Sequence, residues 1–344
     1  MPHRTFLAFI APSLVVMLLF IALPILSVAY QSLFVEHEQV VTTVESCGPF
    51  GCNTETRVDT EAMAALRAEQ PMGRFNWLGT YTNASHLAFA EVAEIWRDAP
   101  GIGAALKAMM NLPFYKALFF TVIYTAIVTP LVIIFGFLIA LAINGVPRIL
   151  KGPVIFFSLL PMIVTPLIGS LVLFWMIDSR GVIGAVLQLL FDDPELSLKA
   201  SPTLTWLVLF FYGVWHHAPF SFIVFYAGLQ TIPDDTLESA MVDGASRWER
   251  IRFVVIPHLA SLVTFVALIQ LMDNFRVFEP IIGFSAQASA TSLSWLIYSD
   301  LRSGDTPLFG SAAATSMLTI IGVAILLTPV LIRTWREFSR MSAR

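Results

Sequence analysis

The sequence predicts an all-α membrane protein with about six transmembrane helices. Of its 344 residues, 57% are hydrophobic and only 13% carry a charge, which leaves too little polar surface to cover a water-soluble globule. A helix that crosses the hydrocarbon core needs roughly 20 mostly apolar residues, because its backbone must satisfy its own hydrogen bonds there. The chain has such stretches at 6–30, 115–144, 153–177, 204–228, 254–283 and 309–332, of which the fifth is interrupted by polar residues.

The first apolar stretch has two interpretations. It could be a cleaved signal peptide with Arg4 as its charged region. However, the apolar run from Phe6 to Tyr30 is longer than a signal core and contains Pro24. We therefore interpret residues 1–30 as an N-terminal transmembrane helix that is retained.

The placement of Lys and Arg predicts the orientation, because short cytoplasmic loops are enriched in both. If the amino terminus is inside, the cytoplasmic segments hold Arg4, Arg148, Lys151, Arg247, Arg250, Arg252, Arg333, Arg336, Arg340 and Arg344. Residues 31–112 then lie outside, where acidic residues outnumber basic ones. We expect a multi-pass protein of a bacterial inner membrane with both termini in the cytoplasm, including a tail at 336–344.

Residues 31–112 are predicted to form a periplasmic insert between the first and second spans. Residues 59–69 show helical spacing, with Thr60 able to cap the helix. The segment 84–110 is also rich in helix-forming residues and is broken by Pro100 and Gly101. The insert is small and polar, so we expect it to pack on the outer mouth of the helix bundle.

Two cysteines lie close together in the insert. Cys47 and Cys52 flank a Gly-Pro-Phe-Gly stretch that suits a tight reversal, and an oxidising periplasm favours a small disulfide between them. Zinc binding is the alternative, although no histidine is close in sequence. The disulfide would be a local staple without chemistry, and we predict no metal site and no catalytic residue in the chain.

The core, predicted over 113–335, contains two informative connections. Val182–Phe191 is apolar but too short to cross the membrane, so it is expected to lie at the outer surface as an interfacial helix. The connection 230–259 is long and mixed in character. Pro233 can open a helix there, Gly244 breaks it, and Ser246 can cap a second helix. This predicts a compact cytoplasmic helix–glycine–helix knob.

The knob carries a pattern of residues that is more specific than a surface helix pair requires. Glu238-Ser239-Ala240, then Asp243-Gly244-Ala245, and then Ile256-Pro257 closely resemble the coupling loop of permease subunits in binding-protein-dependent ABC importers. The usual Glu-Ala-Ala is Glu-Ser-Ala here, which exchanges one small residue for another.

Other segments resemble the same family and, within it, the permeases of maltose- and glycerol-phosphate-type sugar importers. The resemblance extends from residue 6 to residue 335, and the insert departs from it most. The segments that carry it are Phe75–Tyr81, Leu159–Pro161, Trp215–Pro219, Asn274-Phe275 with Phe278, Thr291–Tyr298 and Gly310–Ala314.

The resemblance implies a type I ABC importer permease fold and a set of partners. These are a second homologous permease that forms a heterodimer with this chain, a dimer of ATP-binding subunits that hold ATP and Mg, and a periplasmic substrate-binding protein. It also implies that the knob seats in an ATPase subunit through Glu238, Ala240, Asp243, Gly244, Ala245 and Pro257. The chain has no Gly-x-x-x-x-Gly-Lys-Ser/Thr motif, so it cannot hold ATP in that way, and nothing indicates nucleic-acid binding.

Polar side chains inside the spans indicate a substrate pathway, because such groups are costly in hydrocarbon. Gln270, Asp273 and Asn274 share one helix face at i, i+3 and i+4 spacing, and their amides and carboxylate suit sugar hydroxyls. Residues His216, His217 and Phe220 lie near the middle of the fourth span. The competing interpretations are hydrogen bonds between helices for the histidines and an ion pair between Asp273 and Arg276.

The predicted function is passage of a sugar, polyol or glycoside through the membrane, driven by ATP in partner subunits. A stand-alone secondary transporter or channel is one alternative, but the cytoplasmic knob would then have no purpose. An intramembrane metal enzyme using His216, His217 and Asp273 is the other. Adjacent histidines on a helix point about 100° apart, which makes a poor shared ligand set.

Overall fold

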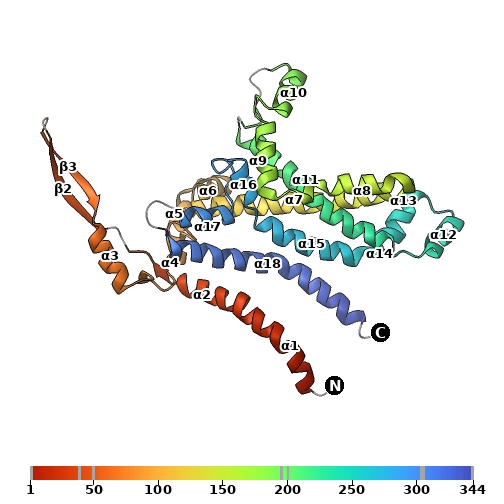
Figure 1. The fold of residues 1–344 in the computed structure, drawn as a ribbon, viewed down its shortest axis with the longest axis horizontal. Coiled ribbons are helices and arrows are strands. Elements are labelled where there is room, and N and C mark those ends of the chain that lie inside the picture. Colours follow the sequence, from red (N-terminus) through yellow and green to blue (C-terminus); the bar gives the residue numbers. More distant parts are fainter. Residues whose placement is uncertain are drawn as a thin grey trace. The chain divides into compact units, whose positions relative to one another are not determined.

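The computed structural model describes residues 3–37, 40–48, 51–193, 197–199, 201–302 and 307–341, and these residues are mostly helical (Figure 1). The chain divides into two compact units, which are described separately below. The first unit holds residues 1–115 and 296–320, and the second holds residues 116–295 and 321–344. The predicted domain boundaries stay a prediction.

The first unit contains the amino-terminal helix and the insert. Its elements are α1 (His3–Met17), a π-helical turn (Leu18–Ala22), α2 (Leu23–Gln31), β1 (Phe34–Val35), β2 (Val41–Gly48), β3 (Gly51–Val58), α3 (Thr60–Glu69), β4 (Arg74–Phe75), α4 (Gly79–Thr82), α5 (Phe89–Asp98) and α6 (Ile102–Met109). The first unit also includes the start of helix α7 (Pro113–Asn144), the C-terminal part of α17 (Leu293–Leu301) and the first turns of α18 (Phe309–Met341).

The insert contains strands that the sequence analysis did not predict. Strands β2 and β3 form an antiparallel hairpin in which Val41 pairs with Val58 and Cys47 with Cys52, and β1 pairs with β4. The side chains of Cys47 and Cys52, and with them the predicted disulfide, lie outside the described part of the structure. The predicted helix at 59–69 is α3, but its cap is Asp59, whose carboxylate accepts from the N–H groups of Glu61 and Ala62. Thr60 is already helical and therefore cannot serve as the cap.

The second unit contains most of the membrane-spanning part. Its elements are the remainder of α7, then α8 (Arg148–Ile163), α9 (Pro166–Met176), α10 (Val182–Phe191), α11 (Pro202–Leu229), α12 (Asp234–Val242), α13 (Arg247–Arg250), a π-helical turn (Ile251–Val255), α14 (Ile256–His258), α15 (Ala260–Phe275), α16 (Glu279–Gly283), and the rest of α17 and α18.

Six spans are confirmed if bent helices are included. Among the described residues, four helices are long and apolar enough to cross a membrane: Ala8–Gln31, Pro113–Asn144, Pro202–Leu229 and Phe309–Arg336. Two further spans are bent pairs, α8–α9 at 95° and Arg247–His258 with α15 at 66°. The third span was expected to be continuous over 153–177. It breaks at Val164 and Thr165 because Pro166 favours an extended conformation in the residue before it.

Two clusters of buried side chains hold the second unit together. The first includes Phe120, Tyr124 and Val128 of α7, Leu209 and Tyr212 of α11, and Ile281 and Phe284 at α16. The second core cluster consists of Ala140, Ile143, Phe222, Phe225, Leu229, Ile232, Val255, Leu259 and Val266. Helix α11 contributes to both clusters and is the central helix of this unit.

Candidate functional site

A cavity of about 390 Å³ lies between α7, α11 and the α15–α16 segment, and we call it the histidine cavity. It brings together four of the predicted pathway residues, which come from the fourth and fifth spans. Its lining residues are Tyr124, Pro166, Tyr212, Gly213, His216, His217, Asp273, Asn274, Arg276, Val277, Glu279 and Pro280. A Cβ atom on Gly213 would collide with the Tyr124 hydroxyl, so only glycine permits this close approach of α11 to α7.

Asn274 is the most constrained polar residue of the histidine cavity. Its side chain is only 1% exposed, and Nδ2 donates to Thr129 Oγ1 on α7 at 3.0 Å and to Gln270 Oε1 at 3.5 Å. Its Oδ1 atom is buried without a hydrogen-bond partner in the described structure. A buried acceptor without a donor is costly, and such a group in a cavity is suited to a hydroxyl of a bound molecule.

The histidine cavity also contains charged and aromatic side chains. Arg276 Nη2 lies 3.0 Å from Asp273 Oδ1, so the ion pair considered from the sequence is present. The His216 ring stacks on Tyr212 with centroids 5.7 Å apart and planes 7° apart, and the Tyr212 hydroxyl donates to the Pro166 carbonyl at 2.6 Å. Stacking and this hydrogen bond fix the wall of the cavity.

Two of the predicted pathway residues do not line the histidine cavity. Gln270 is absent from the lining, and its Oε1 atom accepts from Asn274 Nδ2. Phe220, one turn beyond His216, is half-buried and packs against the second core cluster instead. Within the described residues, no group of three or more His, Cys, Asp or Glu side chains is arranged to hold a metal ion.

The segment 230–259 folds as the predicted knob. Helix α12 ends at Gly244 in a Schellman motif, in which Ala245 N–H bonds the Ala240 carbonyl at 2.9 Å and Gly244 N–H bonds the Met241 carbonyl at 3.0 Å. Gly244 has φ +81°, a left-handed conformation that disfavours a side chain. The second helix starts with a capping box between Ser246 and Glu249, in which each residue's side chain bonds the other's backbone N–H.

The outer surface of the knob has both charged and apolar side chains. Glu238, Asp243 and Pro257 are exposed, whereas Ala240 and Ala245 are half-buried. Five large apolar side chains are also exposed, namely Met241, Val242, Trp248, Phe253 and Ile256, with Val242 at 88%. Figure 1 shows α12 and α13 at one end of the second unit, beyond the ends of α11 and α14. An exposed apolar patch rimmed by charges is typical of a protein–protein contact.

The base of the knob is closed by contacts that the sequence did not reveal. Thr231 Oγ1 lies 3.0 Å from His258 Nε2, which joins the two ends of the loop. Gln230 Nε2 donates to Asn144 Oδ1 at the end of α7 at 3.2 Å. Ile232 and Val255 belong to the second core cluster, and Leu237 packs against it. The knob is therefore attached to α7, α11 and α15 together.

Known proteins resemble the chain over most of its length. A family model described as "Binding-protein-dependent transport system inner membrane component" matches residues 100–336. The trehalose/maltose transport system permease protein MalF of Thermococcus litoralis is 27% identical over 250 residues, which are 71% of this chain and 82% of that protein. The trehalose transport system permease protein SugA of Mycobacterium tuberculosis is 28% identical over 65% of this chain and 71% of its own.

The fold is also similar to a solved structure. A bacterial ABC transporter involved in the import of the acidic polysaccharide alginate matches with a TM-score of 0.59 and 22% identity, covering 73% of this chain and 90% of the matched chain. This likeness shows the fold, a type I ABC importer permease. Because the family model spans more than half of the residues, the chain belongs to the family of binding-protein-dependent transport system inner membrane components and is an integral membrane transport subunit.

Proposed function

We propose that this chain passes a sugar, polyol or glycoside from a periplasmic binding protein into the cytoplasm, as one permease of an ATP-driven importer. The observation that carries the proposal is the histidine cavity, where an unpartnered buried amide oxygen, an ion pair and an aromatic wall meet in about 390 Å³. Hydroxyl-rich molecules need paired donors and acceptors of this kind. Relatives named as permeases for trehalose, maltose and maltodextrin support the same substrate class.

The partners in this proposal are those that the resemblance implies. A dimer of ATP-binding subunits supplies ATP and Mg, a second homologous permease completes the pathway, and a periplasmic binding protein delivers the substrate. A related alginate transporter was solved with its substrate-bound periplasmic protein, which supports the last of these. The exposed patch of Val242, Trp248 and Phe253, with Glu238 and Asp243 beside it, is the surface that seats in an ATPase subunit.

Charge in the histidine cavity favours a neutral substrate. Asp273 and Arg276 neutralise each other, and the Glu279 carboxylate adds a negative charge to the lining. A sugar acid would meet this charge without compensation from the described lining of this chain. A neutral sugar would instead accept from Arg276 and donate to the carboxylates.

The test is ATP-dependent uptake by the complete complex in proteoliposomes with its binding protein. We expect labelled maltose or trehalose to enter only when ATP is present on the ATPase side, and glucuronate to be excluded. Uptake that continues in the absence of ATP would identify a stand-alone transporter and contradict the proposal. Substitution of Glu238 by Lys should abolish uptake and detach the ATPase while the chain stays inserted in the membrane.

A further inference from the structure

A second cavity of about 330 Å³ lies in the same unit, and we call it the lysine cavity. It is bounded by the end of α9, the start of α11 and the loop after α16. The lining residues used below are Phe174, Lys199, Thr205, Phe284, Ser285 and Ser289. In the orientation proposed above, these segments all lie at the periplasmic ends of their spans.

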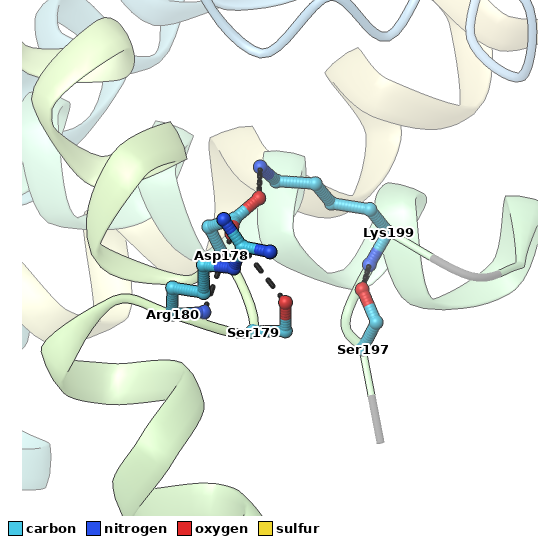
Figure 2. Close-up of polar contacts among 5 residues, drawn as sticks. All are labelled: Asp178, Ser179, Arg180, Ser197 and Lys199. Atoms are coloured by element: carbon cyan, nitrogen blue, oxygen red, sulfur yellow. Dashed lines mark hydrogen bonds and ion pairs between the residues drawn. The ribbon is translucent and has the colours of Figure 1, made fainter. Parts of the chain in front are cut away.

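The lysine cavity holds a cation in a fixed position. Lys199 Nζ lies 2.9 Å from Asp178 Oδ2 (Figure 2). It also lies 3.3 Å from the centroid of the Phe174 ring, so two partners hold it. The backbone N–H of Arg180 and the hydroxyl of Ser179 both donate to Asp178 Oδ1. Asp178 is held mainly by Lys199, which lowers the pKa of its carboxyl. The Lys199 side chain lines the cavity and is 26% exposed, and an ammonium group has three N–H donors.

The opposite wall is also pre-organised. Trp206 Nε1 donates to the Ser289 carbonyl at 2.8 Å, and turn hydrogen bonds from Ser289 and Ala290 to Ala286 close the loop. Ser285 has φ +48° and is exposed, so its hydroxyl is available at the rim. A vicinal diol binds best to adjacent donors and acceptors that are already held in place, because these groups then lose little conformational entropy when the diol binds.

An aromatic pair connects the linings of the two cavities. Phe284 lines the lysine cavity and packs edge-on against Tyr212, with ring centroids 5.6 Å apart and planes at 76°. Tyr212 lines the histidine cavity. Thr205 and Tyr212 lie two turns apart on α11, so the two cavities follow each other along this helix. A molecule that leaves the lysine cavity along α11 therefore meets the histidine cavity next.

We propose that the lysine cavity is a second, outer subsite for one neutral sugar ring, in which Lys199, held in position by Asp178, donates to the ring hydroxyls. This inference rests on the proposed function and deepens it. The size agrees: at about 30 Å³ per water, 330 Å³ corresponds to about ten water molecules, close to the heavy atoms of one hexose. The paired charges of Asp178 and Lys199 neutralise each other, as Asp273 and Arg276 do in the histidine cavity.

The subsite can be tested by protection from alkylation. Ala288 lines the lysine cavity and is exposed, so Ala288→Cys reports on its occupancy in a Cys47→Ser, Cys52→Ser background. The complete importer is incubated without ATP or binding protein, and a membrane-impermeant maleimide is added with glucose, maltose, trehalose or maltotriose. Glycine betaine, which has no hydroxyl groups, controls for osmolarity. Ala93→Cys on the exposed side of α5 is the matched control position.

At least one of the four sugars is expected to slow labelling of Ala288→Cys about tenfold at ten times its dissociation constant, by mass action. Labelling of Ala93→Cys should not change. Protection should be lost in Lys199→Met and in Asp178→Asn, each of which preserves shape and removes charge. Equal labelling rates with and without every sugar, or protection that persists in both variants, would overturn the subsite. If ATP-dependent sugar uptake is intact while Ala288→Cys is unprotected, only the subsite fails; if no sugar is taken up, the proposed function fails.

Discussion

Asn274 combines a structural role with a proposed binding role, and the two can be separated. Its Nδ2 group ties α15 to α7 through Thr129, while its Oδ1 atom is buried without a hydrogen-bond partner in the described structure and is the proposed acceptor for the substrate. Thr129→Val removes only the tie, whereas Asn274→Ala removes both. Thr129→Val should lose about 1 kcal/mol of stability from one buried hydrogen bond, and Asn274→Ala should lose more because it also removes the bond to Gln270.

Only Asn274→Ala should also weaken apparent substrate affinity, by about tenfold, which corresponds to about 1.4 kcal/mol. The measurement is the sugar concentration that gives half-maximal uptake, with the melting temperature recorded beside it. Equal affinity in the two variants would show that Asn274 acts in packing alone.

His86 in the first unit should make stability depend on pH. The fully buried ring lies with Nδ1 2.8 Å from Asn83 Oδ1 and Nε2 3.1 Å from the Ser311 carbonyl. Burial is the main influence and lowers the pKa of His86, although the nearby carboxylates of Asp300 and Glu36 act in the opposite direction. The unfolded chain therefore binds the proton more readily, and stability is complete above the ordinary pKa of 6.5 and declines as the pH falls below it.

The check is the melting temperature of the purified protein between pH 7.5 and pH 5.5, the span around the ordinary histidine pKa of ~6.5. Wild type should lose stability over this range, and His86→Gln should flatten the loss. His37→Gln is the control, since that ring has a contact with the Gln70 carbonyl and lies in the same unit. Burial raises the pKa of Asp300, so Asp300 also contributes to the pH dependence of stability, in the direction opposite to His86. Repeating the measurement in an Asp300→Asn background removes that contribution. An identical slope in wild type and His86→Gln would contradict the assignment.

For individual residues, the sequence predicted which polar side chains matter but not which groups they contact. Gln270, Asp273 and Asn274 could be identified because hydrophilic side chains stand out in an apolar run. Tyr212 could not, because an aromatic residue in a span looks like ordinary core. Phe220 lies outside the histidine cavity, and its place in the substrate pathway stays a prediction, because a position within one turn of His216 does not fix which neighbour fills the adjacent space.

Among the helices and loops, the knob is the segment that the sequence predicted most fully. Its glycine, its serine cap and its opening proline each have a fixed position in local structure, so no distant contact was needed. The breaks in the third and fifth spans were harder to predict. A proline within an apolar run is compatible with a kink or a full break, and packing against α11 and α16 decides between them.

The conformation of Gly244 gives a prediction for the knob. Gly244→Ala places a Cβ atom at φ +81° and should cost about 1 kcal/mol in knob stability, so coupling should weaken. Gly145→Ala, in the connection after α7, is the control, because its Cβ would only touch the Ala142 carbonyl at 3.6 Å. Sugar-stimulated ATP hydrolysis by the complex is the measurement. Equal hydrolysis in the two variants would contradict the role of the turn.

For the whole molecule, the decisive prediction concerns orientation. Val242→Cys, at the most exposed position of the knob, should react with an impermeant maleimide only from the cytoplasmic side. Ala93→Cys in the insert should react only from the periplasmic side. Both measurements can be made in intact cells and in inverted vesicles. Reaction of Val242→Cys in intact cells would show that the topology is opposite to the one proposed, and it would contradict the importer function.

The bond between Thr231 and His258 turns the knob into a closed ring. The ends of α11 and the fifth span meet at that bond, so force applied at Trp248 or Val242 acts on both helices. Those two helices carry His216 and Asn274, which face the same cavity about three turns or more away from the knob. Any motion received at the cytoplasmic surface would therefore reach both walls of that cavity as a single rigid shift.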